Sequence, residues 1–151
     1  MLDTAAQDRE VRIAIAAEIQ GSGAIPSAAD VAARLGTTTD AVFEAFTRLF
    51  GARVLILDAA SREILAFDPF STGPTDFAVS AVGREWWGIC GWDALGIPAA
   101  LRSDGTLRTR CGDCGEPLEV SVTGGTVNGP EGTVLQIGPP ALQWWKDIIF
   151  T

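Results

Sequence analysis

Apolar residues recur at helical spacing three times in the first 50 residues, and two strand-like segments follow. The first predicted helix spans residues 5–20, buries one apolar side and ends at Gly21. The second begins at the N-cap Ser27 and ends at Gly36. The third lies in TTTDAVFEAFTRLF, which begins with a threonine cap. VLILD and EILAF, joined by AASR, predict a hairpin, so residues 1–70 are expected to form a winged-helix-like module.

The remaining residues, 71–151, predict a second domain built mainly of strands. DPFSTGPTD is interpreted as a linker, and DFAVSAV after it as a strand. A tryptophan-rich helix is expected over Glu85–Leu95, with Gly96 and Pro98 ending it. LRTRCGDCGEPLEVSVTGG predicts two strands around a turn, TVLQIGPP one more strand, and ALQWWKDIIFT closes the chain. The short connections favour antiparallel pairing. The predicted fold class is therefore α+β: a three-helix module followed by an antiparallel-sheet domain that carries a Cys/Asp-bearing helix.

The charge of the chain argues against one function of such a module. The 151 residues carry a net charge of −8, and residues 1–70 contain six Arg against ten Asp and Glu. Binding to nucleic acid requires clustered Lys and Arg, so we disfavour DNA binding and expect a structural or dimerisation role.

Two further observations bear on location and on the cysteines. No apolar run approaches the roughly 20 residues that cross a bilayer, and the N-terminal MLDTAAQDRE is acidic and polar. We therefore expect a cytoplasmic protein without a membrane partner, whose three cysteines are reduced and available for metal or redox chemistry.

Histidine is absent, which restricts the available chemistry. Ser–His–Asp catalysis, histidine-ligated zinc and an imidazole pH switch are excluded. Catalysis or binding must therefore use thiols, carboxylates, hydroxyls or basic side chains.

The segment WWGICGWDALGIPAAL holds the first candidate site, Cys90 and Asp93. In a helix these residues lie at i and i+3, within reach of each other. Apolar surroundings raise the pKa of a carboxyl group, and a thiolate prefers soft metals such as mercury, copper(I) or zinc. The pair is thus suited to bind a soft electrophile and deliver a proton to it. On spacing alone, a buried structural cysteine with a capping or ion-paired aspartate is the more frequent arrangement.

The second candidate is Cys111-Gly-Asp-Cys114-Gly, which has the pattern of a zinc knuckle. A closed zinc site needs four ligands, so the others would have to come from Cys90 with Asp93 or from a second chain. Three roles stay open for Cys111 and Cys114: structural thiols, a zinc site, and direct participation in the chemistry. A thioredoxin-type redox site is disfavoured because a strand, not a helix, follows.

The five tryptophans are Trp86, Trp87, Trp92, Trp144 and Trp145. Most of them are expected to pack in the core of the second domain, with two or three left to line an apolar pocket around Cys90.

These segments resemble the organomercurial (alkylmercury) lyases. The resemblance rests on the Cys-x-x-Asp of WWGICGWDALGIPAAL with its trailing DALGIP, and on RTRCGDCGEPLEVSV, in which Cys111 precedes Gly115 and Pro117. FSTGPTDFAV and the N-terminal helical segment fit the same family, so the resemblance covers nearly the whole chain.

The resemblance implies protonolysis of carbon–mercury bonds, giving a hydrocarbon and Hg(II). Cys90 would be a mercury ligand and Asp93 the proton mediator. Organomercury compounds would be the substrates, with no organic cofactor. Low-molecular-weight thiols or a mercuric reductase would accept the Hg(II). An apolar pocket poor in water would suit an organic mercury substrate and keep Asp93 protonatable.

The chain departs from the family in one place. The family has a second essential cysteine shortly after the segment that here is WWKDIIFT, and this sequence stops at Thr151. A shortened sequence, a natural loss of function and a selenocysteine codon read as a stop would each explain this. We expect mercury binding to persist and turnover to be the step at risk. Cys111 and Cys114 are expected to substitute in part for the missing cysteine. The alternative function is a thiol-based binding or sensing protein for a soft metal ion (Hg, Zn or Cu), and a zinc-stabilised winged-helix regulator is disfavoured by the acidic charge.

Overall fold

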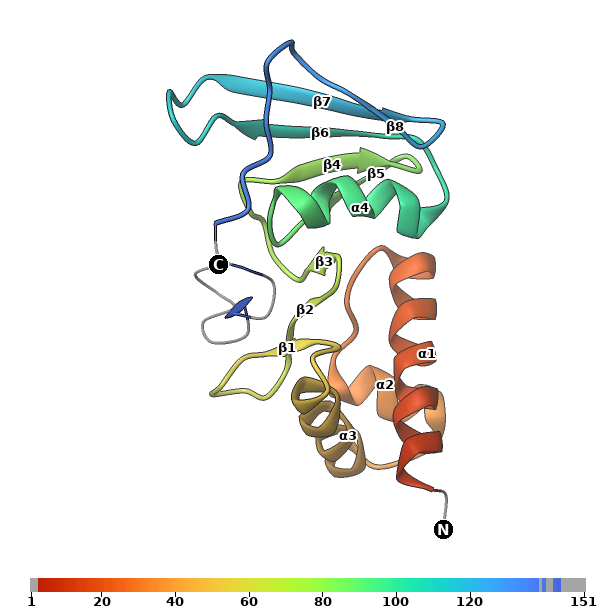
Figure 1. Ribbon diagram of the computed structural model, residues 1–151. Coiled ribbons are helices and arrows are strands. Elements are labelled where there is room, and N and C mark those ends of the chain that lie inside the picture. Colours follow the sequence, from red (N-terminus) through yellow and green to blue (C-terminus); the bar gives the residue numbers. More distant parts are fainter. Residues whose placement is uncertain (1–2, 139, 141–142, 145–151) are drawn as a thin grey trace.

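Helices and antiparallel sheets make up the fold of the chain, for which a computed structural model describes residues 3–138, 140, 143 and 144 (Figure 1). Its helices are α1 (Thr4–Ser22), α2 (Ala28–Leu35), α3 (Thr39–Gly51) and α4 (Gly91–Leu101). Its strands are β1 (Ile56–Leu57), β2 (Ile64–Phe67), β3 (Phe70–Ser71), β4 (Ala78–Ala81), β5 (Arg84–Trp87), β6 (Gly105–Arg110), β7 (Pro117–Thr123) and β8 (Thr126–Asn128). The predicted α+β class is confirmed.

The three N-terminal helices begin and end largely where their capping residues predict. Ser27 and Asp30 form a reciprocal capping box at the start of α2, and Gly36 ends that helix with a φ of 64°. Thr38 caps α3 by accepting a hydrogen bond from Ala41 N. Helix α1 continues past Gly21 and ends at Gly23, whose φ of 82° is the left-handed conformation that glycine adopts without strain.

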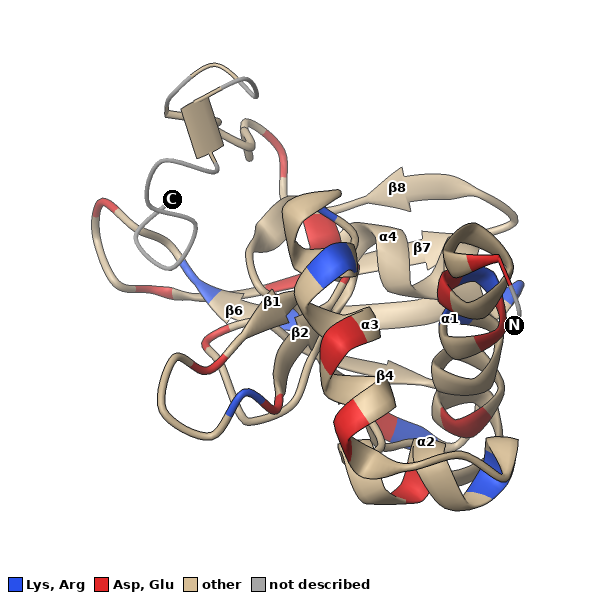
Figure 2. Ribbon diagram, turned by 90° about the horizontal axis from the view of Figure 1, so that it is seen from below, with Lys and Arg blue, Asp and Glu red and all other residues tan. Residues whose placement is uncertain are grey.

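These helices pack around fully buried apolar side chains, among them Ile15 on α1 and Phe46 on α3. The predicted hairpin is present as β1 and β2, to which β3 adds a third antiparallel strand. Figure 2 shows acidic positions on all three helices. The basic residue of α3, Arg48, is held by Asp8 of α1 in an ion pair of 2.7 Å, which leaves α3 without a free basic side chain for a phosphate. The winged-helix description stays a prediction.

The second sheet has the strand order β5-β4-β6-β7-β8, with every neighbouring pair antiparallel. Helix α4 packs on β4 and β6, on the side of the sheet that faces the N-terminal helices (Figure 1). The buried apolar cluster runs without interruption from Val11 of α1 to Val120 of β7. The division into domains at residue 70 therefore stays a prediction.

Two predicted assignments after residue 67 are wrong. Thr133–Gly138 was predicted to form a strand and does not. The last strand among the described residues is β8, a few residues earlier, where the turn at Gly124–Gly125 folds the chain back onto β7. The predicted linker contains strand β3. Most of the closing segment ALQWWKDIIFT lies outside the described residues.

The tryptophans divide between core and surface. Trp86 is 4% exposed, packs its ring 5.3 Å from that of Phe70 and donates a hydrogen bond to Ala81 O. Trp92 is 58% exposed and does not belong to the buried core. Trp145 lies outside the described residues.

None of the described helices combines the length and the apolar character needed to cross a bilayer.

Candidate functional site

Cys90 occupies the N-cap position of α4, just after the turn that follows β5. Its backbone is extended, and its carbonyl oxygen accepts a hydrogen bond from Ala94 N at 2.9 Å. The predicted helix over Glu85–Leu95 is therefore wrong in its first part, because Arg84–Trp87 pair with β4 as strand β5. It is also wrong at its end, since α4 continues through Gly96 and Pro98 to Leu101.

The turn that places Cys90 depends on Gly88. A Cβ atom at this position would lie 2.7 Å from Ala94 N, so only glycine lets the chain pass this close to α4. The backbone of Gly88 is held on both sides: its N–H donates to Phe77 O at 3.0 Å, and its carbonyl accepts from Thr75 Oγ1 at 2.6 Å. Strand, turn and helix cap are thus fixed relative to one another.

The Cys90 and Asp93 side chains meet across the first turn of α4. Cys90 Sγ donates a hydrogen bond to Asp93 Oδ2 at 3.2 Å. The predicted proximity is confirmed, although the pair joins a helix cap to the first turn and not two positions inside a helix. Both side chains are half-buried. Apolar groups lie beside them, because a Cβ at the neighbouring Gly91 would be 2.9 Å from Leu135 Cδ1 and 3.5 Å from Phe77 Cε1.

This environment changes the acidity of both groups. Burial raises the pKa of Asp93 to about 6, the hydrogen bond from Cys90 opposes the rise, and the negative charge of the nearby Asp68 adds to it. Burial also raises the pKa of the Cys90 thiol, and the Asp93 charge contributes in the same direction. The pair therefore places a carboxyl group that can exchange a proton near neutral pH beside a thiol, the type of ligand that soft metals prefer.

Asp68 is a neighbour of the site that the sequence analysis did not identify. It lies 25 positions before Asp93, just before β3 in the segment interpreted as a linker. Its neighbour Pro69 approaches α4, since a Cβ at Gly96 would lie 3.8 Å from Pro69 Cβ. No local pattern predicts this approach, because it follows from the packing of β3 beside α4.

Cys111 and Cys114 lie in the turn between β6 and β7, as predicted. Gly115 N donates to Cys111 O at 2.9 Å and closes the turn, and Gly115 has a φ of 74°. Hydrogen bonds from the backbone N–H groups of Cys114 and Asp113, and from the Cys114 thiol, lower the pKa of the Cys111 thiol. Cys111 is half-buried and Cys114 is exposed.

The described residues do not bring the two cysteine sites together into one metal centre. Among them, no group of three or more His, Cys, Asp or Glu side chains is placed to hold a metal ion. A four-ligand zinc site made from Cys111, Cys114, Cys90 and Asp93 is therefore not supported within this part of the chain.

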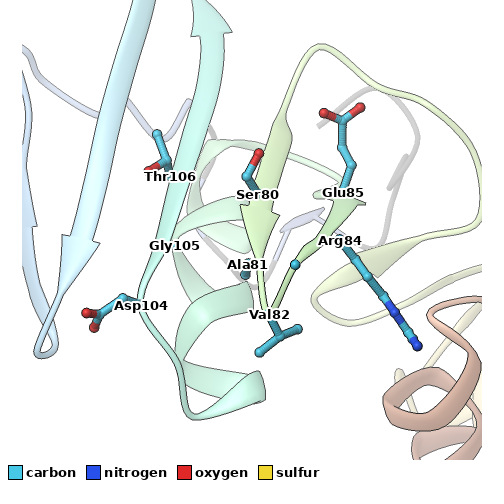
Figure 3. Close-up of a pocket in the computed structure, with 9 residues that line it drawn as sticks. Ser80, Ala81, Val82, Arg84, Glu85, Asp104, Gly105 and Thr106 are labelled. Carbon is cyan, nitrogen blue, oxygen red and sulfur yellow. The ribbon is translucent and has the colours of Figure 1, made fainter.

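A hollow of about 520 Å³ lies at the other end of the sheet, around the β4–β5 turn and the start of β6 (Figure 3). Its charged side chains do not converge: Asp104 and Arg84 point away from each other. Each is already engaged, Asp104 with Gly124 N at 2.8 Å and Arg84 with Gly21 O at 3.0 Å. Because a binding site needs convergent polar groups, this hollow does not compete with the Cys90–Asp93 pair as the candidate site.

Comparison with known proteins identifies the family. The family model described as MerB, alkylmercury lyase, matches residues 70–151, more than half of the chain. The chain belongs to the alkylmercury lyase family. The match includes strands β3 to β8 and helix α4 with Cys90 and Asp93, so the family resemblance of the sequence is confirmed.

A solved structure shares the fold. The chain resembles the structure titled "Crystal structure of the mercury-bound form of MerB2", with a TM-score of 0.64 and 22% sequence identity over 80% of this chain. The aligned part covers 60% of the length of that protein. A search of the curated proteins found no match.

Proposed function

We propose that this chain takes part in the protonolysis of carbon–mercury bonds, with Cys90 as the mercury ligand and Asp93 as the proton mediator. The hydrogen bond of 3.2 Å between Cys90 Sγ and Asp93 Oδ2 carries the proposal, because it joins a soft ligand to a tunable acid. Family membership and the mercury-bound state of the structural neighbour support it.

The pair accounts for each transfer in the reaction. The Cys90 sulfur attacks the mercury of an organomercury cation, a sulfur–mercury bond forms, and the thiol proton passes to Asp93 Oδ2. The protonated Asp93 then donates this proton to the carbon, and the electron pair of the carbon–mercury bond becomes the new carbon–hydrogen bond. The hydrocarbon leaves, and Hg(II) stays on the Cys90 sulfur until solution thiols remove it. General acid catalysis of this kind typically accelerates a reaction by about 10² to 10⁴-fold.

The partly buried position of the pair suits this chemistry. A carboxyl group with a pKa of about 6 accepts a proton from a neighbouring thiol more readily than an ordinary aspartate and still releases it near neutral pH. The side chains of Phe77 and Leu135, which lie beside Gly91, provide an apolar surface for the organic part of a substrate.

The test is incubation of the full chain with phenylmercury and excess glutathione, with benzene measured by gas chromatography. The proposal is supported if the chain releases benzene, if Cys90→Ser abolishes this release, and if Asp93→Asn lowers it by about 100-fold or more. Asp76→Asn is the matched control, because Asp76 is exposed and the substitution removes the same charge from a position outside the Cys90–Asp93 pair. Full retention of activity in Cys90→Ser would refute the assignment.

The alternative function is capture of a soft metal ion without bond cleavage. The exposed dithiol turn at Cys111 and Cys114 favours it, because accessible thiols bind such ions without an acid nearby. Mercury that stays bound while no benzene is released would select this alternative.

A further inference from the structure

The turn between β6 and β7 presents two thiols close together on a preformed backbone. Cys111 N donates to Glu116 O at 2.8 Å, and Gly115 N donates to Cys111 O at 2.9 Å. Arg110 Nη1 also donates to Gly115 O at 3.1 Å. These bonds fix the turn, so Cys111 and Cys114 are held near each other before any ligand arrives.

Both sulfur atoms are accessible to a thiophilic ion. The Cys114 side chain is exposed and that of Cys111 is half-buried. Cysteine sulfur is a soft ligand of the kind that such ions prefer. A Cβ built at Gly112 or Gly115 would meet no atom within 4 Å, so the outside of the turn is open to an incoming complex.

The register of the sheet places this turn at the same end of the molecule as Cys90. Ala78 of β4 pairs with Trp87 of β5 on one side and with Arg108 of β6 on the other. Cys90 follows Trp87 by three positions, and Cys111 follows Arg108 by three. Adjacent strands are about 4.8 Å apart, so Trp87 and Arg108 are separated by about 10 Å across β4. In Figure 1 the β6–β7 turn and the N-terminal end of α4 lie on the same side.

We propose that Cys111 and Cys114 form a second binding site for Hg(II), which holds the ion through both sulfur atoms and does not require Cys90. Binding is a thiol exchange: two protein sulfur–mercury bonds form, the two bonds of Hg(II) to glutathione break, and the two protein thiol protons pass to the released glutathione sulfurs. No oxidant or reductant takes part. This site could also receive the Hg(II) that leaves Cys90, a consequence that rests on the proposed function.

The experiment uses the full chain with Cys90→Ser, so that only the turn thiols remain, and offers Hg(II) as its bis-glutathione complex. Native mass spectrometry is expected to count one Hg(II) per chain. Adding Cys111→Ser or Cys114→Ser is expected to weaken the binding of Hg(II), measured in competition with glutathione, by at least about 100-fold. Only one protein sulfur then holds the ion, and the gain from a second sulfur in the same molecule is lost. Asp113→Ser in the Cys90→Ser background is the matched control, since it changes the same turn, keeps both thiols and should bind as before.

A second measurement needs no substitution and therefore does not depend on variant folding. The wild-type chain is alkylated with iodoacetamide after addition of Hg(II), and the cysteine peptides are mapped. Protection of Cys111 and Cys114 together supports the site. Absence of bound Hg(II) in Cys90→Ser, or protection of one turn thiol without the other, overturns it. Benzene release by the wild-type chain is read separately, so failure of this site and failure of the lyase activity give different results.

Discussion

Cys90 Sγ lies 3.2 Å from Asp93 Oδ2, with Cys90 as the cap of α4 and Asp93 in its first turn. Burial, the largest cause, and the nearby Asp68 raise the pKa of the Asp93 carboxyl group above its ordinary value, and the thiol hydrogen bond partly opposes this rise.

The first prediction concerns stability against pH. The pKa of Asp93 rises from 3.8 to about 6 on folding, so its contribution to stability is fully present below about pH 4 and is lost as pH rises through 6. Asp93→Asn should therefore raise the free energy of unfolding by about 1–2 kcal/mol at pH 7.5, after allowing for partial exposure, and change it little at pH 4. Urea unfolding at both pH values measures this. A change of equal size at both values would contradict the raised pKa.

The second prediction concerns the reactivity of the Cys90 thiol. The Asp93 charge adds to the rise in the thiol pKa that burial causes, so its removal in Asp93→Asn should lower that pKa. Alkylation of Cys90 by iodoacetamide at pH 8 should then be faster by about threefold to tenfold, because the thiolate is the reacting form. Mass spectrometry of the Cys90 peptide follows the rate, and Asp76→Asn should leave it unchanged. A slower reaction in Asp93→Asn would show that the carboxylate assists the thiolate instead.

How much of this site follows from the sequence depends on whether the determining contacts are local. Ser27 with Asp30 and the turn at Gly36 were predicted correctly, since both ends of α2 are set by residues within a few positions. The closeness of Cys90 and Asp93 was also predictable, because a separation of three residues brings the side chains together both inside a helix and at its cap.

The start of α4 was not predictable in this way. Trp86 and Trp87 belong to β5 because they pair with Val79 and Ala78 of β4, and the connecting turn places Val82 at a φ of 47°, a conformation that valine rarely adopts. A short apolar run fits a helix or a strand equally well when its partner strand is unknown. Asp68 was missed for the same reason, since its approach to Asp93 depends on tertiary packing.

The third prediction concerns the turn that positions Cys90. Gly88→Ala would bring a Cβ to 2.7 Å from Ala94 N and 2.8 Å from Ala94 Cα, and backbone atoms cannot move aside as a flexible side chain can. We expect a loss of about 1–3 kcal/mol in stability, together with a longer Cys90–Asp93 separation. Thermal unfolding measures the first effect, and alkylation of Cys90 reports the second. Gly73→Ala is the matched control, because a Cβ there meets no atom within 4 Å and its φ needs no glycine. An equal loss in both variants would contradict the steric explanation.

The fourth prediction separates two ion pairs of the helical part. Arg48 binds Asp8 through two nitrogens, with Nε 2.9 Å and Nη2 2.7 Å from Oδ1, and its side chain is 32% exposed. Arg34 and Glu18 meet through one contact of 3.1 Å with side chains 49% and 37% exposed. Double-mutant cycles should give a coupling of about 1 kcal/mol for Arg48–Asp8 and below about 0.5 kcal/mol for Arg34–Glu18, since two-point geometry and lower exposure reduce solvent screening. Equal couplings measured by urea unfolding would contradict the effect assigned to two-point geometry and lower exposure.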